Sequence, residues 1–421
     1  MAEVTGGREG RAAEDGRAQG AQGRSAAPAA RARLCVAVLV LMGFALGCSE
    51  FVVIGIESEL ARDFGVSLST TGQLISLFAL PYAVMTPTLA LATGRFRRYH
   101  VMLAYLALFL LANVVSSFAA TFGALLFARV VLGSISGGLL AVGVTFLPEL
   151  VGAERTSGAL TLVYASYSVA LIVATSAGKM LASTVGWRVA MYGTLAVSVV
   201  ACVLLALLMP RSGATDEPAS AREQLRLLSE PCILAGMAVF VFGVGSVYTF
   251  YGYVTPYLEQ VLGMGAADAS RTLVAYGAVT LASNFLSGWL DERFGLRSLA
   301  VVFPVLAAVL LGLFLAGGNA GPALVMVMLL ALLMYLASIP SISNFMDVAR
   351  RRYPKAFTLA SSLEPLSFNV GIAAGTFVGG RVIVGPGISY LGLFGAMLAA
   401  VAFVLVLVTI ALSRRERARQ A

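Results

Sequence analysis

Twelve long apolar segments run through this chain of 421 residues and leave little sequence between them. A helix that crosses a membrane needs about 20 mostly apolar residues, and each segment is about that long. Only 12% of the residues are charged, whereas a soluble domain carries about 25%. We therefore predict an all-α polytopic membrane protein with spans at 34–56, 70–92, 100–119, 122–147, 157–184, 188–209, 231–255, 269–290, 298–317, 321–345, 356–383 and 387–412.

Positive charge is distributed unevenly over the segments between these spans. If the N-terminus lies inside, 23 of the 29 Lys and Arg residues fall on cytoplasmic segments and 4 on outer segments. This bias follows the positive-inside rule and predicts a cell-membrane protein with both termini in the cytoplasm. It accounts for the net charge of +8, so we expect a lipid bilayer rather than nucleic acid as the partner of the basic residues.

A polar stretch at 210–230 divides the spans into six and six, and an internal repeat supports that division. The pair Arg-Phe follows the second span at Arg95 and the eighth span at Arg293. The sequence "VATSAG" at 173–178 also aligns with "VGIAAG" at 370–375 near the same offset. Such repeats are typical of secondary transporters that rock around a midplane site. We predict two pseudo-symmetric six-helix bundles, at 33–209 and 231–412.

The segments outside the two bundles are polar. Residues 1–32 contain almost no large apolar side chain, which predicts a disordered cytoplasmic tail. Residues 413–421 form a basic cytoplasmic tail. The second half of the linker at 210–230 has two open interpretations, a short amphipathic helix on the membrane surface or a solvated linker.

Motifs in both halves resemble those of one transporter family. They are "SEFVVIGIESELARDFGVS" at 49–67, "RVVLGSISGG" at 129–138, "GWR" at 186–188, "GWLDERFGLR" at 288–297 and "SSLEPLSFNVGIAAG" at 361–375. The chain resembles the major facilitator superfamily, in the twelve-span drug:proton antiporter branch that includes sugar and purine nucleoside efflux pumps. This resemblance implies the major facilitator fold, alternating access and coupling to protons.

Some positions depart from the family pattern. Gly94 lies where an aspartate is usual, and Ser176 lies where the antiporter motif has proline. Lys179 replaces a small residue, and Glu364 replaces the usual asparagine. The charges introduced at Lys179 and Glu364 lie inside spans, so we expect them to serve this protein's own task.

The sequence contains no pattern of reactive residues that indicates an enzyme. The stretch "AGK" at 177–179 resembles the end of a phosphate-binding loop, but Val173 replaces the leading glycine and a buried helix cannot form that loop. The cysteines have no metal-ligand spacing and are interpreted as packing residues: Cys35, Cys48, Cys202 and Cys232. We expect no metal and no cofactor, and an ion gradient as the energy source.

Glu50 and Arg129 are charges at similar depth in neighbouring spans. Each lies roughly 10 Å from the outer surface, because seven residues of helix separate it from its outer end. A charge inside a membrane needs a partner or a wet cavity, so we predict that the two interact. The pair either fixes the helices as a static ion pair or exchanges protons at Glu50. In the second case Arg129 would stabilise the ionised form when it is close.

Lys179 also lies roughly 10 Å from the outer surface, about seven residues below Gly186. It could snorkel to the outer headgroups, since its stem is long. Alternatively it faces the cavity and contacts an anionic group of the substrate or Glu50, which would make it the residue that selects the substrate. Glu57 and Glu59, near the outer end of the first span, are expected to be solvated.

Glu364 lies roughly 13 Å from the cytoplasmic surface, nine residues after Lys355. It has two interpretations, a substrate or proton site, or a structural pair with a polar group on the second or tenth span. Pro365 follows it and removes one backbone hydrogen bond, which predicts a kinked helix.

Further polar and aromatic residues are candidates for the cavity lining. Tyr248 and Tyr251 offer stacking faces, although an interfacial aromatic belt is the alternative for them and the expectation for Tyr257. The other candidates could equally be satisfied packing positions: Gln73, Tyr164, Tyr167 and Asn369. Loop charges could form a cytoplasmic gate or only reflect topology: Arg95, Arg98, Asp291, Glu292, Arg293 and Arg297.

The sequence thus predicts a monomeric secondary transporter for a small molecule. The preferred function is proton-coupled export of a small polar or amphipathic molecule, such as a drug, sugar or nucleoside, by alternating access. The alternative is a proton symporter that takes up an anionic metabolite, favoured by Lys179 and Ser176. A membrane receptor or scaffold is a third possibility of a different class.

Overall fold

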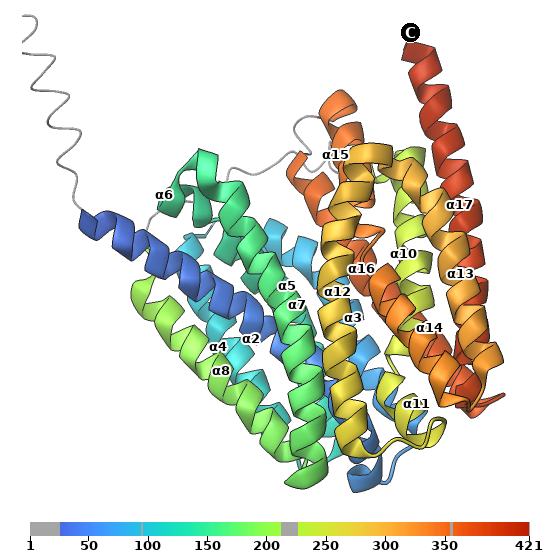
Figure 1. Ribbon diagram of the computed structural model, residues 1–421. Helices are drawn as coiled ribbons and strands as arrows, with labels where there is room; N and C mark the ends of the chain where they lie inside the picture. Colours follow the sequence, from blue (N-terminus) through green and yellow to red (C-terminus); the bar gives the residue numbers. More distant parts are fainter. Residues whose placement is uncertain (1–25, 94–95, 212–225, 354–356, 421) are drawn as a thin grey trace, which may run out of the picture.

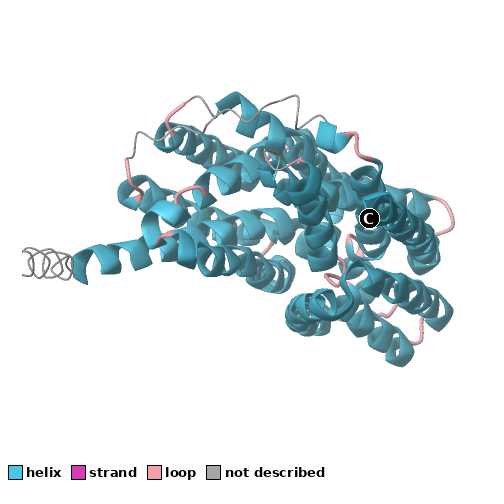
Figure 2. Cartoon of the chain, turned by 90° about the horizontal axis from the view of Figure 1, so that it is seen from above, coloured by secondary structure: helices cyan, strands magenta, loops and turns pink. Residues whose placement is uncertain are grey.

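The chain folds into helices joined by short loops, as the apolar segments predict (Figures 1 and 2). The structure is a computed structural model, and it describes residues 26–93, 96–211, 226–353 and 357–420. These described residues contain no strand.

The first half of the chain forms the helices drawn from blue to green in Figure 1. They are α2 (Ala26–Phe64), α3 (Leu68–Thr93), α4 (Arg98–Ser117), α5 (Phe122–Val144), the short α6 (Leu147–Val151), α7 (Ala153–Thr184) and α8 (Trp187–Leu208).

The second half forms the helices drawn from yellow-green to red. They are α10 (Pro231–Tyr251), α11 (Val254–Gln260), α12 (Ala266–Phe294), the 3-10 turn η1 (Gly295–Ser298), α13 (Leu299–Ala316), α14 (Ala320–Leu333), α15 (Ser338–Arg352), α16 (Phe357–Val384), the 3-10 turn η3 (Ile388–Tyr390) and α17 (Leu391–Gln420).

Length and hydropathy divide these helices into twelve spans. Within the described residues, eleven stretches are long and apolar enough to cross a membrane, and one of them, Ala266–Ala316, has 51 residues. At 1.5 Å per residue a straight helix of that length would measure roughly 75 Å, far more than a hydrocarbon core of about 30 Å. Gly295 turns the chain there with a φ of 54°, a backbone conformation that suits glycine. The stretch is therefore two spans, α12 and α13, and the predicted twelve-span fold is confirmed.

The ends of some segments differ from the sequence-based expectation. Residues 26–32, assigned to a disordered tail, already belong to α2, and the basic tail at 413–420 continues α17. Most of the linker at 212–225 lies outside the described residues, as do residues 1–25. The described end of the linker, 226–228, is helical, and Leu227 is fully buried there. The tenth span is broken between α14 and α15.

Helices of the same half approach each other closely at small residues. A Cβ added to Gly133 on α5 would overlap the backbone of Phe78 on α3. A Cβ added to Gly375 on α16 would overlap the backbone of Gly245 on α10. These glycines serve packing, because only a residue without a side chain fits between the backbones.

The two halves meet along two pairs of helices. Helix α3 packs along α16, and α7 packs along α12. The repeat that relates spans 2 and 8 also relates spans 5 and 11, so the two contacts correspond to each other under the pseudo-symmetry. We call the end of the molecule with α6, α15 and the C-terminus the terminal face, and the end with α11 the distal face (Figure 1).

Candidate functional site

A small pocket lies between the two halves, near the middle of α2. Residues of both halves line it: Glu50, Phe51, Ile54, Ile75, Phe78, Ala79 and Arg129 from the first half, and Tyr248 and Ile372 from the second. It has room for about one water molecule. One carboxylate and one guanidinium therefore share an otherwise apolar space with a tyrosine.

Arg129 is 1% exposed and is held by backbone carbonyl groups. Its guanidinium donates to the carbonyl oxygens of Ser49, of Glu50 at 2.9 Å and of Leu74 at 3.0 Å. The ring of Phe78 lies 4.4 Å from the guanidinium carbon, a distance suited to a cation–π contact. These contacts replace the water that the buried charge has lost.

The predicted interaction of Glu50 with Arg129 is present, but it runs through the backbone. Arg129 binds the carbonyl oxygen of Glu50. Among the ion pairs of the described residues, none joins the Glu50 carboxylate to Arg129. The carboxylate, on a residue only 8% exposed, shares the pocket with the guanidinium without being locked to it. A carboxylate held in this way can change its protonation state without breaking the contacts that fix Arg129.

Glu364 lies on α16, on the terminal side of the pocket. Its side chain lies near Ser338, at the start of α15, so the tenth span provides a polar group close to it, as one interpretation expected. Tyr82 and Tyr335 lie within electrostatic range of both Glu364 and Glu50. The two carboxylates thus lie near the same pair of tyrosines.

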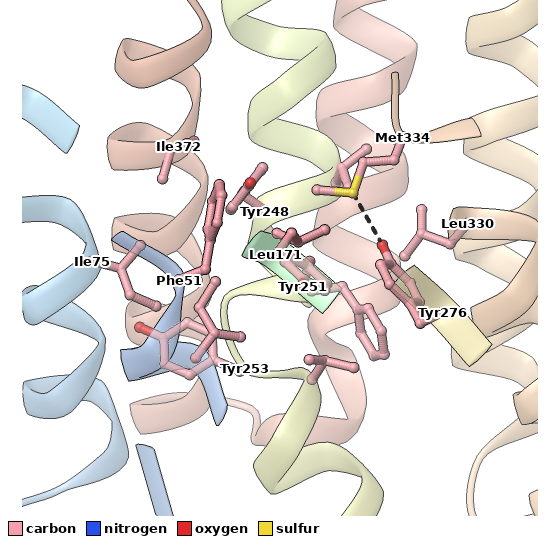
Figure 3. Packing of buried hydrophobic residues seen from close by; sticks show 14 of the residues in the cluster. Phe51, Ile75, Leu171, Tyr248, Tyr251, Tyr253, Tyr276, Leu330, Met334 and Ile372 are labelled. Carbon is pink, nitrogen blue, oxygen red and sulfur yellow. Dashed lines mark hydrogen bonds between the residues drawn. The ribbon is translucent and has the colours of Figure 1, made fainter. Parts of the chain in front are cut away.

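Aromatic rings of the second half form a wall around Tyr248, the tyrosine that lines the pocket (Figure 3). Tyr248 packs edge-on against Tyr251, with ring centroids 5.5 Å apart, and against Phe368 at 6.0 Å. Tyr251 stacks on Tyr276 at 4.8 Å. An interfacial belt is wrong for Tyr248 and Tyr251, which are 1% exposed. It is wrong for Tyr257 too, which is equally buried and packs on the Phe250 ring.

Two polar atoms near this wall have no partner among the described residues, the Tyr248 hydroxyl and Asn369 Oδ1. The amide nitrogen of Asn369 donates to the carbonyl of Pro365 at 3.0 Å, which leaves the amide oxygen free. Buried polar atoms of this kind are expected to bind water or a ligand. They are the strongest candidates for hydrogen bonds to a substrate.

The remaining residues that were predicted to line the cavity differ from one another in their exposure and position. Tyr167 is half-buried, and its ring packs against Gly47 of α2. Tyr164, one turn nearer the terminal face, is 45% exposed. Gln73 is exposed and lies about 160° around α3 from the pocket-lining Ile75, at about 100° per residue. Its expected place in the cavity is therefore wrong, because the opposite face of α3 lines the pocket.

Lys179 lies toward the distal face and has partners that the sequence analysis did not assign. Its ammonium lies 2.6 Å from Glu59 Oε1 on α2 and also pairs with Glu259 on α11. Lys179 is fully buried, so snorkelling is wrong for this conformation. The expectation that Glu57 and Glu59 are solvated is wrong too, because they are 0% and 7% exposed.

The Lys179–Glu259 pair joins the first half to the second, and other contacts near the distal face do the same. Thr255 donates to the carbonyl of Ile54 at 2.7 Å, and Ser270 donates to the carbonyl of Ser176 at 2.9 Å. The tyrosine ring of Tyr253 passes so close to Gly72 that no side chain would fit there. The halves are therefore shut against each other at the distal face.

The predicted gate charges lie toward the terminal face. Arg98 donates to the carbonyl of Thr145, and Ser343 donates to Asp291. Arg293 lies over the ring of Trp289 at 5.5 Å. Glu292 and Arg297 are exposed. These contacts stay within one half each, and Arg95 lies outside the described residues.

Comparison with known proteins identifies the family. The family model of the Major Facilitator Superfamily matches residues 39–363. The inner membrane transport protein YdhP of Escherichia coli (strain K12) is 29% identical over 371 residues, which cover 87% of this chain and 94% of that protein. The uncharacterized MFS-type transporter YtbD of Bacillus subtilis (strain 168) is 25% identical over 380 residues, 90% of this chain and 96% of that protein.

The fold is also found among solved structures. A bacterial homolog of the human lysosomal transporter Spinster, described as inward-facing and unoccupied, superposes with a TM-score of 0.72 at 17% identity. The match covers 90% of this chain and 96% of that chain. The family match, the transporter relatives and the shared twelve-helix architecture together show that this chain is a multi-pass membrane transporter, not an enzyme, and that it belongs to the major facilitator superfamily.

Proposed function

We propose that the chain is a proton-coupled transporter that exports a small polar or amphipathic molecule from the cell by alternating access. The observation that carries the proposal is the Glu50 carboxylate in the pocket between the two halves. It is a buried titratable group beside a guanidinium that is fixed by carbonyls. Such a group favours ionisation when water enters the pocket and protonation when the pocket is dry, while Arg129 stays beside it.

The walls of the pocket support a substrate with a flat or ring-shaped part and hydrogen-bonding groups. Tyr248 provides an aromatic face and a free hydroxyl, and Asn369 provides a free amide oxygen. Aromatic rings with a few polar groups are typical of small-molecule sites. We propose Tyr248, Tyr251, Asn369 and Tyr167 as substrate contacts, and Glu364 as a second acidic contact nearer the terminal face.

The direction of transport depends on how the protein sits in the membrane. We propose that the terminal face is cytoplasmic, as the positive-inside rule predicts, and that the protein acts as a monomer in the cell membrane. With the distal face shut, the conformation described here is then closed to the outside. An exporter collects its substrate in this conformation.

The alternative function, uptake of an anionic metabolite, was inferred from Lys179 as a free cation and from Ser176. Lys179 is neutralised by two carboxylates in this conformation, and Ser176 donates to the carbonyl of Ile172 within its own helix. Lys179 therefore offers no unpaired charge to an anion here, so export is the better supported function.

Everted membrane vesicles test the proposal. In them, an exporter coupled to protons moves substrate into an acidified lumen and lets protons out. We expect one member of a panel of monosaccharides, nucleosides and amphipathic cations to raise the luminal pH, read with a fluorescent pH probe. Vesicles without the protein provide the control. Accumulation that needs the opposite pH gradient would indicate uptake, and flux independent of any gradient would exclude coupling.

A further inference from the structure

A second carboxylate on α2, Glu57, lies in the seal at the distal face and has no role in the site described above. It is seven residues beyond Glu50, which is about two helical turns and roughly 10 Å along the axis. The two side chains therefore lie on the same face of α2, the face that meets the second half of the chain. Glu57 is 0% exposed.

No cation pairs with Glu57 among the described residues. The basic residues of this part of α2 and of the helices packed on it have partners of their own: Lys179 with Glu59 and Glu259, Arg62 with Glu59, Arg188 with Asp63, and Arg129 with the carbonyls of Ser49 and Glu50. An isolated ionised carboxylate is too costly to bury, so such a group takes up a proton instead.

The contacts of the Glu57 carboxyl group also indicate a proton on it. Thr71 Oγ1 lies 2.8 Å from the carbonyl oxygen of Leu68 and 3.3 Å from Glu57 Oε1. A hydroxyl group has one proton to donate, and the carbonyl can only accept. The shorter contact takes that proton, so the longer one becomes a hydrogen bond only if the Glu57 carboxyl donates. The other oxygen, Oε2, is buried without a partner.

The second half of the chain covers Glu57 in this conformation. Helix α11 reaches α2 through the bond from Thr255 to the carbonyl of Ile54. Tyr253, just before α11, passes beside Gly72 and lies within electrostatic range of Glu57. Tyr253 is neutral and its hydroxyl donates to the carbonyl of Thr376. Separation of the halves at the distal face would remove this cover and admit water.

We propose that Glu57 is a second proton-binding site, which holds a proton while the distal face is shut and releases it to the outside when that face opens. In the release step the carboxyl O–H bond breaks and the proton passes to water on the outer side. On closure a proton returns from the same side. External acidity therefore favours the shut conformation, independently of the proton exchanged at Glu50.

This inference rests on the alternating access and membrane orientation proposed above, but not on coupling at Glu50. Val185 and Ala267 are exposed positions in the two halves near the distal face. Spin labels on cysteines at these positions report the opening of that face as a distance measured by pulsed electron paramagnetic resonance. In lipid nanodiscs we expect the long-distance component to grow as the buffer is changed from about pH 5 to about pH 9. This range includes the pH values at which buried carboxyl groups lose their proton. The four native cysteines are buried, and the unsubstituted protein gives their background.

Glu57→Gln is expected to remain in the short-distance state over the whole range, because the amide imitates the protonated acid. Glu59→Gln is the matched control. It weakens the Lys179 cluster, so its long-distance component should be larger at each pH while the pH dependence remains. Thermal unfolding checks that Glu57→Gln is folded. The inference is wrong if the distal face of this folded variant opens with rising pH as that of the parent does.

Glu50→Gln separates this inference from the proposed function. Failure of proton coupling would appear as gradient-driven transport that survives Glu50→Gln. Failure of the present inference would appear as an unchanged pH response of the distances in Glu57→Gln. The two results are independent and can be told apart.

Discussion

Two fully buried cations, Arg129 and Lys179, are stabilised in different ways. Arg129 binds backbone carbonyls of α2 and α3, all within the first half of the chain. Lys179 binds one carboxylate in its own half and one, Glu259, in the other half. The contacts of Arg129 can therefore persist when the halves move apart, whereas those of Lys179 cannot. One cation belongs to the rigid part of the mechanism and the other to the part that opens.

The largest expected effect is the loss of stability when Arg129 is replaced. Arg129→Met removes three hydrogen bonds from a charged donor to carbonyl oxygens inside helices, and a hydrogen bond of a charged group contributes about 1.5–3 kcal/mol. We expect the free energy of unfolding to fall by several kcal/mol, measured by thermal unfolding in detergent. Arg188→Met, at a half-exposed arginine paired with Asp63, is the control and should change it little. If both variants were equally stable, the carbonyl contacts would not be what holds the first half together.

Lys179→Met is expected to act on conformation as much as on stability. Removing one partner of a buried ion pair costs about 3–5 kcal/mol, and here the cost falls on the shut conformation. We expect a cysteine at Ser69, next to Gly380 of the other half, to be labelled faster by a membrane-impermeant maleimide.

The double variant Lys179→Met/Glu259→Gln should restore part of the protection, because one unpaired carboxylate is removed. If Lys179→Met changed the range of substrates but left labelling unchanged, Lys179 would select the substrate, as the sequence suggested, and would not seal the distal face.

A neutral contact between the halves should matter less than the ion pair. Thr255→Val removes the hydrogen bond to the carbonyl of Ile54 and should shift the balance of conformations by about 0.5–1.5 kcal/mol. The same labelling assay measures this shift. Ser246→Ala, which removes a bond within α10, is the matched control. An effect equal to that of Lys179→Met would contradict the importance given to the charge.

The smallest effect is expected at the terminal face, at Tyr353. Its hydroxyl donates to the Glu230 carboxylate at 2.8 Å, and this bond raises the pKa of Tyr353. Stabilisation by the bond is therefore complete below the ordinary tyrosine pKa of about 10 and is lost as pH rises through the raised value. We expect Tyr353→Phe to cost about 1 kcal/mol or less, seen in thermal unfolding at neutral pH. The difference from the parent should vanish in strongly alkaline buffer, and labelling at the distal face should not change.

The fold was predictable because each span is a long apolar segment, whose length is set by the thickness of the hydrocarbon core of the membrane. The polar partners were less predictable. Equal depth brought Glu50 and Arg129 together correctly, but it did not show that the guanidinium binds carbonyls. Glu259 was missed because it lies in the short helix α11 beyond the end of a span, where an acid looks solvated. The unmet need of Lys179 for a counter-charge was the signal that could have found it.

Aromatic residues show the same limit. The sequence placed Tyr248 and Tyr251 at the right depth, but not Tyr276 and Phe368, which pack on them from other helices. The prediction for Gln73 was wrong because the depth of a residue in the membrane does not determine which side of its helix faces the cavity. The direction of a side chain depends on the packing of whole helices, and an apolar span offers little periodicity from which to infer it.

The proposed coupling is tested most directly at Glu50, in liposomes, with a substrate found by the vesicle screen. Glu50→Gln keeps the size and polarity of the side chain but cannot exchange a proton. We expect it to retain the exchange of labelled for unlabelled substrate, which needs only binding and movement, and to lose accumulation driven by a pH gradient. Glu50→Asp, which keeps the carboxyl group, should retain some of both. Full pH-driven accumulation by Glu50→Gln would contradict the account.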